Sequence, residues 1–87
     1  MILDGAKVIA ISRKDDFGEI KYTDDSIKPI PIKYLAICKY DNKKDIYLFM
    51  CSNNIEVEQD SIYDSIEEAM KRATELNKNV VWEDGSI

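Results

Sequence analysis

The stretch of sequence that decides the fold is residues 32–51, which reads IKYLAICKYDNKKDIYLFMC. Its two apolar runs, 32–40 and 46–51, flank the polar loop Asp41-Asn42-Lys43-Lys44, and this pattern is typical of a β-hairpin. Closing the hairpin at this loop fixes the register: Tyr34 opposite Cys51, Ala36 opposite Phe49 and Cys38 opposite Tyr47. The two cysteines then lie about 13 Å apart along one face, beyond the ~7 Å reach of a disulfide, so we expect two free thiols.

One face of the predicted hairpin is aliphatic and must be buried. The turn Asn53-Asn54 favours a third strand over residues 55–59, with Met50 opposite Val57. The aliphatic face then contains Leu35, Ile37, Ile46, Leu48, Met50, Ile55 and Val57.

A helix over residues 66–77 is the expected cover of this face. Its apolar residues recur at spacings of three and four and form one stripe: Ile66, Ala69, Met70, Ala73 and Leu76. Ser65 with Glu68, or Asp64 with Glu67, matches the capping box that starts a helix, and Asn77-Lys78-Asn79 ends it.

The remaining segments add strands to this unit. Residues 7–12 predict a first strand, 19–23 a weaker return strand and 80–82 a short closing strand. Two prolines make residues 26–32 extended but exclude them from the interior of a sheet. We therefore predict one domain, 1–87, with an α+β fold: an antiparallel sheet of four to six strands with one helix packed on one face, in the order β-β-β-β-β-α-β.

The other face of the hairpin is aromatic, and it carries both cysteines. One interpretation is that the N-terminal hairpin or the segment Ile30-Pro31-Ile32 covers these rings. The other is that they form an exposed surface for a partner or a second copy, because aromatic residues are enriched at protein interfaces. The candidate interface residues on this face are Tyr34, Tyr40, Tyr47 and Phe49.

Composition disfavours several classes of function. The 87 residues include 17 Asp and Glu, 12 Lys and Arg and no histidine, for a net charge of −5. The chain lacks the commonest general base and metal ligand, and it has no Gly-rich phosphate loop and no C-x-x-C pair. We therefore expect no enzymatic activity, no metal and no cofactor.

Charge and hydropathy also bear on partners and location. A negative chain is a poor ligand for nucleic acids and for anionic membranes, so we expect neither as a partner. The sequence has no signal-peptide pattern and no apolar run near the ~20 residues that span a bilayer. We expect a cytoplasmic protein.

The negative charge is concentrated in the second half of the chain. Residues 1–44 contain nine basic and seven acidic residues, whereas residues 45–87 contain three basic and ten acidic ones. Asp64, Glu67 and Glu68 suit the positive end of the helix macrodipole. Glu56, Glu58 and Asp60 form either a solvated acidic surface or a site that attracts a basic protein.

Part of the chain resembles a known family. A sheet meander, Ile46-Tyr47-Leu48-Phe49-Met50 and then Ile55-Glu56-Val57, is followed by the helix start Asp64-Ser65-Ile66-Glu67-Glu68-Ala69. Over residues 32–77 the chain resembles bacterial antitoxins of the HicB type and small immunity-like proteins, a resemblance that implies a sheet-then-helix unit that binds a protein toxin. Only ten residues follow Asn77, so we expect no counterpart of the C-terminal DNA-binding segment of HicB antitoxins and no transcriptional autoregulation, and no functional residue is carried over.

These observations favour a small acidic protein-binding module without enzymatic activity. Two alternatives remain open from the sequence. One is an immunity or antitoxin protein that neutralises a basic toxin, and the other is a structural protein that associates with itself through its aromatic face.

Overall fold

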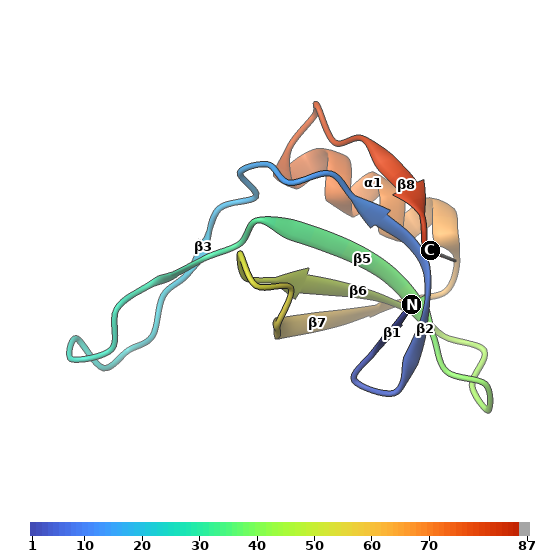
Figure 1. Cartoon of the computed structure of the whole chain (residues 1–87), viewed down its shortest axis with the longest axis horizontal. Helices are drawn as coiled ribbons and strands as arrows, with labels where there is room; N and C mark the ends of the chain where they lie inside the picture. Colours follow the sequence, from blue (N-terminus) through green and yellow to red (C-terminus); the bar gives the residue numbers. More distant parts are fainter. Residues whose placement is uncertain (86–87) are drawn as a thin grey trace.

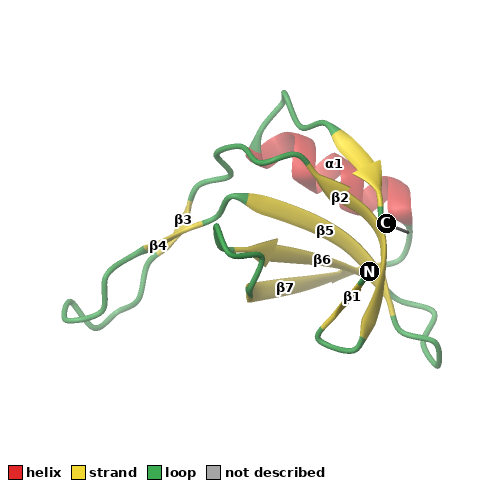
Figure 2. Cartoon of the chain, in the orientation of Figure 1, coloured by secondary structure: helices red, strands yellow, loops and turns green. Residues whose placement is uncertain are grey.

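A computed structural model describes residues 1–85, and a curved antiparallel sheet of six strands with one helix on one face organises the chain (Figures 1 and 2). The α+β class, the sheet and the single packed helix agree with the prediction. The elements in chain order are β1 (Ile2–Leu3), β2 (Ala6–Ser12), β3 (Glu19–Ile20), β4 (Ile30–Pro31), β5 (Tyr34–Lys39), β6 (Ile46–Cys51), β7 (Val57–Tyr63), α1 (Ile66–Leu76) and β8 (Trp82–Asp84).

The sheet is a half-barrel with the strand order β1-β2-β5-β6-β7, and β8 pairs with β2. The β5–β6 hairpin has the predicted register, with Ala36 opposite Phe49 and Cys38 opposite Tyr47. Between β2 and β5, the buried hydroxyl of Ser12 accepts a hydrogen bond of 2.9 Å from the backbone N–H of Leu35. This side-chain bond satisfies an N–H that would otherwise be buried without a partner.

Strand β1 was not predicted, although its turn has a clear sequence signal. Asp4 and Gly5 have φ values of 48° and 80°, and they join β1 to β2 with Leu3 opposite Ala6. Positive φ at both central residues is the requirement of a type I′ turn, for which Asp-Gly is a preferred sequence.

The turn between β6 and β7 corrects the predicted third strand. The backbone N–H of Ile55 donates to the carbonyl of Ser52, and Ile55 has a φ of 58°. Because of this longer turn, β7 begins at Val57, and Met50 lies opposite Gln59 instead of Val57. Ile55 and Val57 therefore pack on the aromatic face, not on the aliphatic one.

The predicted return strand beside β2 is also wrong. β3 pairs instead with β4, with Glu19 opposite Pro31 and Ile20 opposite Ile30. The two short strands form an arm that projects from the sheet (Figure 1). Pro31 lacks an N–H and is tolerated here because this two-stranded ladder lies outside the main sheet.

The helix covers the aliphatic face as expected. Ser65 Oγ accepts from the N–H of Glu68 and caps the helix, whereas the Glu68 carboxylate accepts from the N–H of Asp64, one residue before the cap. Ala69 and Ala73 are fully buried, so the helix approaches the sheet closely. The first core, made mainly of β5, β6 and α1, contains Phe17, Ile32, Leu35, Ile37, Ile46, Leu48, Ala69 and Ala73.

Gly85, just after β8, packs directly on β2. Its N–H donates to the carbonyl of Ile9 at 3.1 Å, and its own carbonyl accepts from the ammonium of Met1 at 2.9 Å. A Cβ atom at this position would lie 2.4 Å from the carbonyl oxygen of Val8, a distance that no packed carbon atom tolerates. Only glycine allows this approach.

We therefore expect Gly85→Ala to lower the free energy of unfolding by about 1–3 kcal/mol, because the added carbon meets backbone and β8 must move away from β2. Urea denaturation followed by the fluorescence of Trp82 measures the loss. Glu83→Ala, an exposed change on β8 two residues before Gly85, is the control and should cost far less. Equal stability of the two variants would contradict the close packing of Gly85 on Val8.

Candidate protein-binding surface

The aromatic face, for which the sequence left a covered face and a partner surface as alternatives, is largely an interior. Tyr47 and Phe49 are only 6% and 1% exposed, so neither ring can contact a partner while the chain keeps this fold. Tyr34 and Tyr40 are half-buried at its border. The interpretation that another segment covers these rings is therefore the correct one for Tyr47 and Phe49.

The cover comes from β2 and from the turn before β7. The buried residues of this second core are Ala6, Val8, Ala36, Cys38, Tyr47, Phe49 and Cys51, with Leu3, Ile11, Ile55 and Val57 packed against it. The segment Ile30-Pro31-Ile32 takes no part, because Ile32 belongs to the first core. The curvature of the half-barrel thus gives the sheet a core on each face.

The aromatic rings are held by contacts within the chain. The rings of Tyr40 and Tyr47 meet edge to face at 5.1 Å, and those of Tyr47 and Phe49 lie 6.2 Å apart. The Tyr40 hydroxyl donates to the carbonyl of Asp4 at 3.1 Å, and the Lys43 ammonium lies 5.6 Å from the centre of the same ring. Tyr40 therefore ties the β1–β2 turn to the second core.

Both cysteines are free and fully buried in the second core. Burial raises the pKa of the Cys38 thiol to about 12, with a smaller contribution from Cys51. Burial likewise raises the pKa of Cys51 to about 12, with smaller contributions from the charges of Asp4 and Glu58. Both thiols are protonated at neutral pH, and they act as small apolar side chains.

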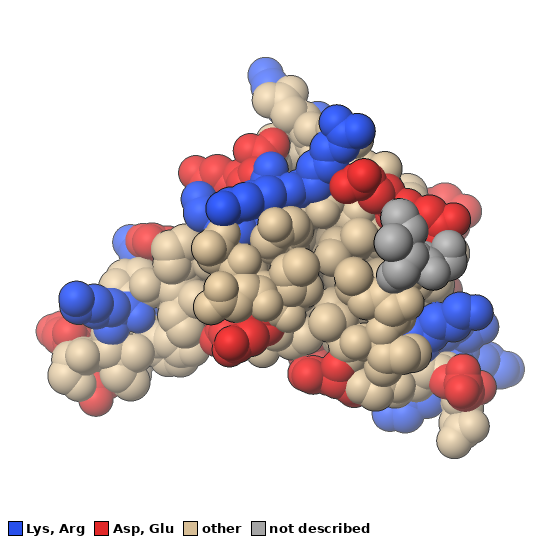
Figure 3. Space-filling view, viewed as in Figure 1, with Lys and Arg blue, Asp and Glu red and all other residues tan. Residues whose placement is uncertain are grey.

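The acidic residues predicted as a second candidate site lie along one edge of the sheet. Glu56 and Asp60 are exposed and Glu58 is half-buried, and within residues 1–85 none of the three forms a salt bridge. We call Glu56, Glu58 and Asp60 the acidic edge. In Figure 3, acidic side chains lie near the start of β7, whereas basic ones gather over the segment that follows β2.

Ile62 extends the acidic edge, and it was not among the residues predicted from the sequence. Its side chain is 59% exposed, and it lies opposite Tyr47, two residues beyond Asp60 on β7. Asp60 lies opposite Phe49, so Asp60 and Ile62 share the face away from the helix. The alternation of residues 58–63 contained the signal, but the predicted strand ended at Gln59.

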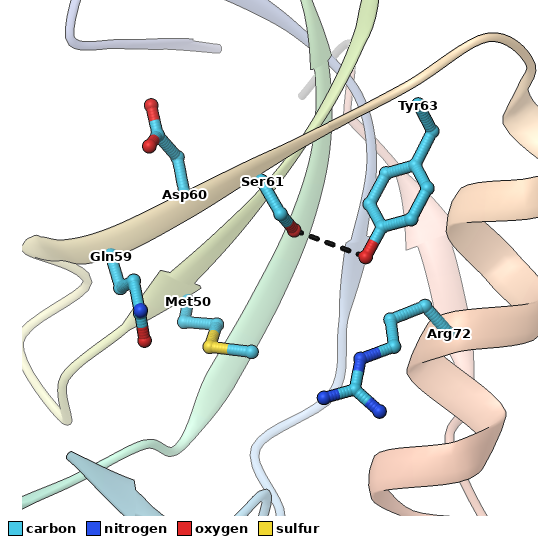
Figure 4. A pocket seen from close by; sticks show the side chains of 6 residues that line it. All are labelled: Met50, Gln59, Asp60, Ser61, Tyr63 and Arg72. Atoms are coloured by element: carbon cyan, nitrogen blue, oxygen red, sulfur yellow. Dashed lines mark hydrogen bonds between the residues drawn. The ribbon is translucent and has the colours of Figure 1, made fainter.

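On the helix side of β7 lies a small pocket of about 170 Å³. Figure 4 shows Ser61 and Tyr63 of β7 turned toward Arg72 of α1, with the Asp60 carboxylate on the other side of the strand. The Ser61 hydroxyl donates to the Tyr63 hydroxyl at 3.1 Å, and Arg72 bonds Glu75 at 3.4 Å. The volume of this pocket falls below the roughly 300 Å³ of small-molecule sites, so the pocket fits a single side chain.

A second pocket, of about 290 Å³, lies at the other end of the sheet. Lys7 and Lys39 face each other across β2 and β5 there, beside Ile9, Tyr40 and Asp41. Both lysines are exposed, and their charges are solvated. This pocket therefore presents no built binding site.

Comparisons of the chain with protein-family models, with curated proteins and with solved structures find no match. Within residues 1–85, no helix is both long enough and apolar enough to cross a bilayer.

Proposed function

We propose that this chain is a protein-binding module without enzymatic activity and that its contact surface is the acidic edge with Ile62. One observation supports the proposal most directly: β7, at the end of the sheet, carries both an exposed isoleucine and carboxylates that form no salt bridge within residues 1–85. An apolar anchor among charges of one sign suits a partner of opposite charge.

The immunity or antitoxin function is the more specific form of this proposal. A basic toxin would be steered toward Glu56, Glu58 and Asp60, because charges of one sign raise the rate of association with a complementary surface. Self-association through the aromatic face is less well supported, because Tyr47 and Phe49 lie inside the second core.

The proposal is tested by capture from native lysate, followed by measurement of association with the captured protein. We expect Glu56→Lys with Asp60→Lys to slow association by about tenfold or more at low salt, since on-rates depend strongly on complementary charge. Both residues are exposed, so these changes leave the two cores intact.

The matched control is Asp25→Lys with Asp41→Lys, which makes the same change of net charge in exposed turns away from β7. Its association rate should stay within about twofold of that of the unchanged protein at moderate salt. If both double variants slow association equally, the net charge steers the partner and the acidic edge does not. A chain that captures no stoichiometric partner and remains monomeric contradicts the proposed function itself.

A further inference from the structure

The backbone of β7 has one side that no strand occupies. The strand order places β7 at the end of the sheet, and among residues 1–85 only β6 pairs with it. One hydrogen bond shows the phase of the ladder: the N–H of Ser52 donates to the carbonyl of Glu56 at 2.9 Å. Ser52 therefore directs its backbone toward the β7 side.

Alternate residues of an antiparallel strand direct their N–H and C=O groups to opposite sides. Leu48 and Met50, which alternate with Ser52, consequently face β7, and their partners Ser61 and Gln59 face back toward them. Asp60 and Ile62 alternate with those partners. Their N–H and C=O groups point away from the sheet, along the open side of β7.

The charge of this edge argues against pairing with a second copy. An antiparallel pairing of two β7 strands centred on Asp60 places one Asp60 against the other and Glu58 beside Ile62. A parallel pairing in register places every acidic residue next to its own copy. Like charges directly opposite each other destabilise a strand pair, so the edge suits a basic strand and not its own sequence.

We infer that the open side of β7 accepts an extended basic segment of a partner protein as an added strand. This inference rests on the proposed function and specifies how a partner binds the acidic edge. Main-chain hydrogen bonds to Asp60 and Ile62 supply affinity, and alternate side chains supply specificity. In an antiparallel strand an apolar residue lies opposite Ile62, and Lys or Arg residues lie opposite Asp60 and Glu58.

The intervening residues of the added strand face the helix side of β7. There the strand passes the pocket of about 170 Å³, which is lined by Met50, Gln59, Asp60, Ser61, Tyr63 and Arg72. Apart from Met50 these side chains are polar, so a small polar side chain fits the pocket best. The recognised segment therefore alternates small polar residues with one apolar and two basic ones.

The probe is the peptide acetyl-Thr-Val-Thr-Lys-Thr-Lys-Thr-amide, and the measurement is amide hydrogen exchange by NMR at millimolar peptide. We expect the amides of Asp60 and Ile62 to exchange at least about tenfold more slowly with the peptide, because each gains a hydrogen bond. The amides of Gln59 and Ser61, already bonded to β6, should change little. A peptide that does not bind, or that binds without slowing Asp60 and Ile62, overturns the inference.

A pair of variants separates strand addition from charge attraction. Asp60→Pro and Asp60→Ala remove the same carboxylate, but only proline removes the outward N–H and blocks the edge. We expect the proline variant to bind the peptide at least about tenfold more weakly than the alanine variant. Equal affinities overturn the inference, and the exchange measurement on the unsubstituted chain decides it even where the proline variant does not fold.

These outcomes are independent of the capture experiment. A partner that is captured, and then lost on reversal of Glu56 and Asp60, supports the proposed function whatever the peptide does. If that partner leaves the exchange of Asp60 and Ile62 unchanged, the acidic edge binds a folded basic surface and strand addition is wrong.

Discussion

Phe49→Ala is expected to lower the free energy of unfolding by about 3–5 kcal/mol, the range for removing a buried aromatic ring. Phe49 is 1% exposed and lies at the centre of the second core, opposite Ala36 and beside Tyr47. Neither neighbour can fill the space, because Ala36 is small and the Tyr47 ring is held by Tyr40. For a chain of this length, with a total stability of about 4–13 kcal/mol, the loss leaves a large unfolded population at 37 °C.

Urea denaturation followed by far-UV circular dichroism measures this loss, and Phe49→Leu is the matched control. Leucine keeps most of the apolar volume, so its cost should be about 1–2 kcal/mol. A cost below about 1 kcal/mol for alanine would show that the second core is not packed as the structure has it.

The β5–β6 hairpin and its helix could be predicted because their signals are local and agree with one another. The loop at residues 41–44 fixes the register, and the spacing from Ile66 to Leu76 fixes the face that α1 buries. The side-chain cap at Ser65 fixes where the helix begins. Each of these rules concerns residues within a few positions of one another, so no knowledge of the distant chain is needed.

The same hairpin could not decide between a covered and an exposed aromatic face. Alternation assigns Tyr47 and Phe49 to a face, but it does not say what lies over that face. The cover comes from Val8, far away in sequence, and from the bend of the sheet that brings Ile55 and Val57 alongside. Curvature is a property of the whole sheet, and it depends on bulges such as those at Val8/Ala10 and Met50/Cys51.

The acidic edge could be predicted only in part, because of one residue. Ile55 has a positive φ of 58°, a conformation that β-branched residues seldom adopt, so the sequence favoured placing it within a strand. The longer turn moves the start of β7 to Val57 and extends the strand to Tyr63. Glu58 and Asp60 keep their predicted role as surface charges, and Ile62 joins them.

Raising the pH above 9 is expected to destabilise the protein strongly through Cys38 and Cys51. Burial raises the pKa of each thiol from its ordinary value of 9.0 to about 12. Between these values the unfolded chain has released both thiol protons while the folded chain retains them. The contribution of the protonated thiols to the free energy of unfolding is therefore present in full below about pH 9. It is lost progressively as the pH rises toward 12.

Linkage sets the size of the effect. Each proton released on unfolding lowers the free energy of unfolding by about 1.4 kcal/mol per pH unit, so two thiols give about 2.7 kcal/mol per unit. Over two pH units that loss is comparable to the whole stability of a domain of this size. We therefore expect the protein to lose much of its free energy of unfolding by about pH 11.

The double variant Cys38→Ala with Cys51→Ala separates the thiols from the other groups that titrate in this range. Tyrosine and lysine side chains are the same in both proteins, so the difference between their slopes of stability against pH belongs to the cysteines. Alanine leaves small cavities and lowers the stability at pH 7. Between pH 9 and 11, however, the free energy of unfolding of the alanine variant should fall less steeply with pH. Urea titrations at half-unit steps of pH measure both slopes. Equal slopes would mean that the thiols ionise as readily in the folded chain as in the unfolded one, which a sealed second core does not permit.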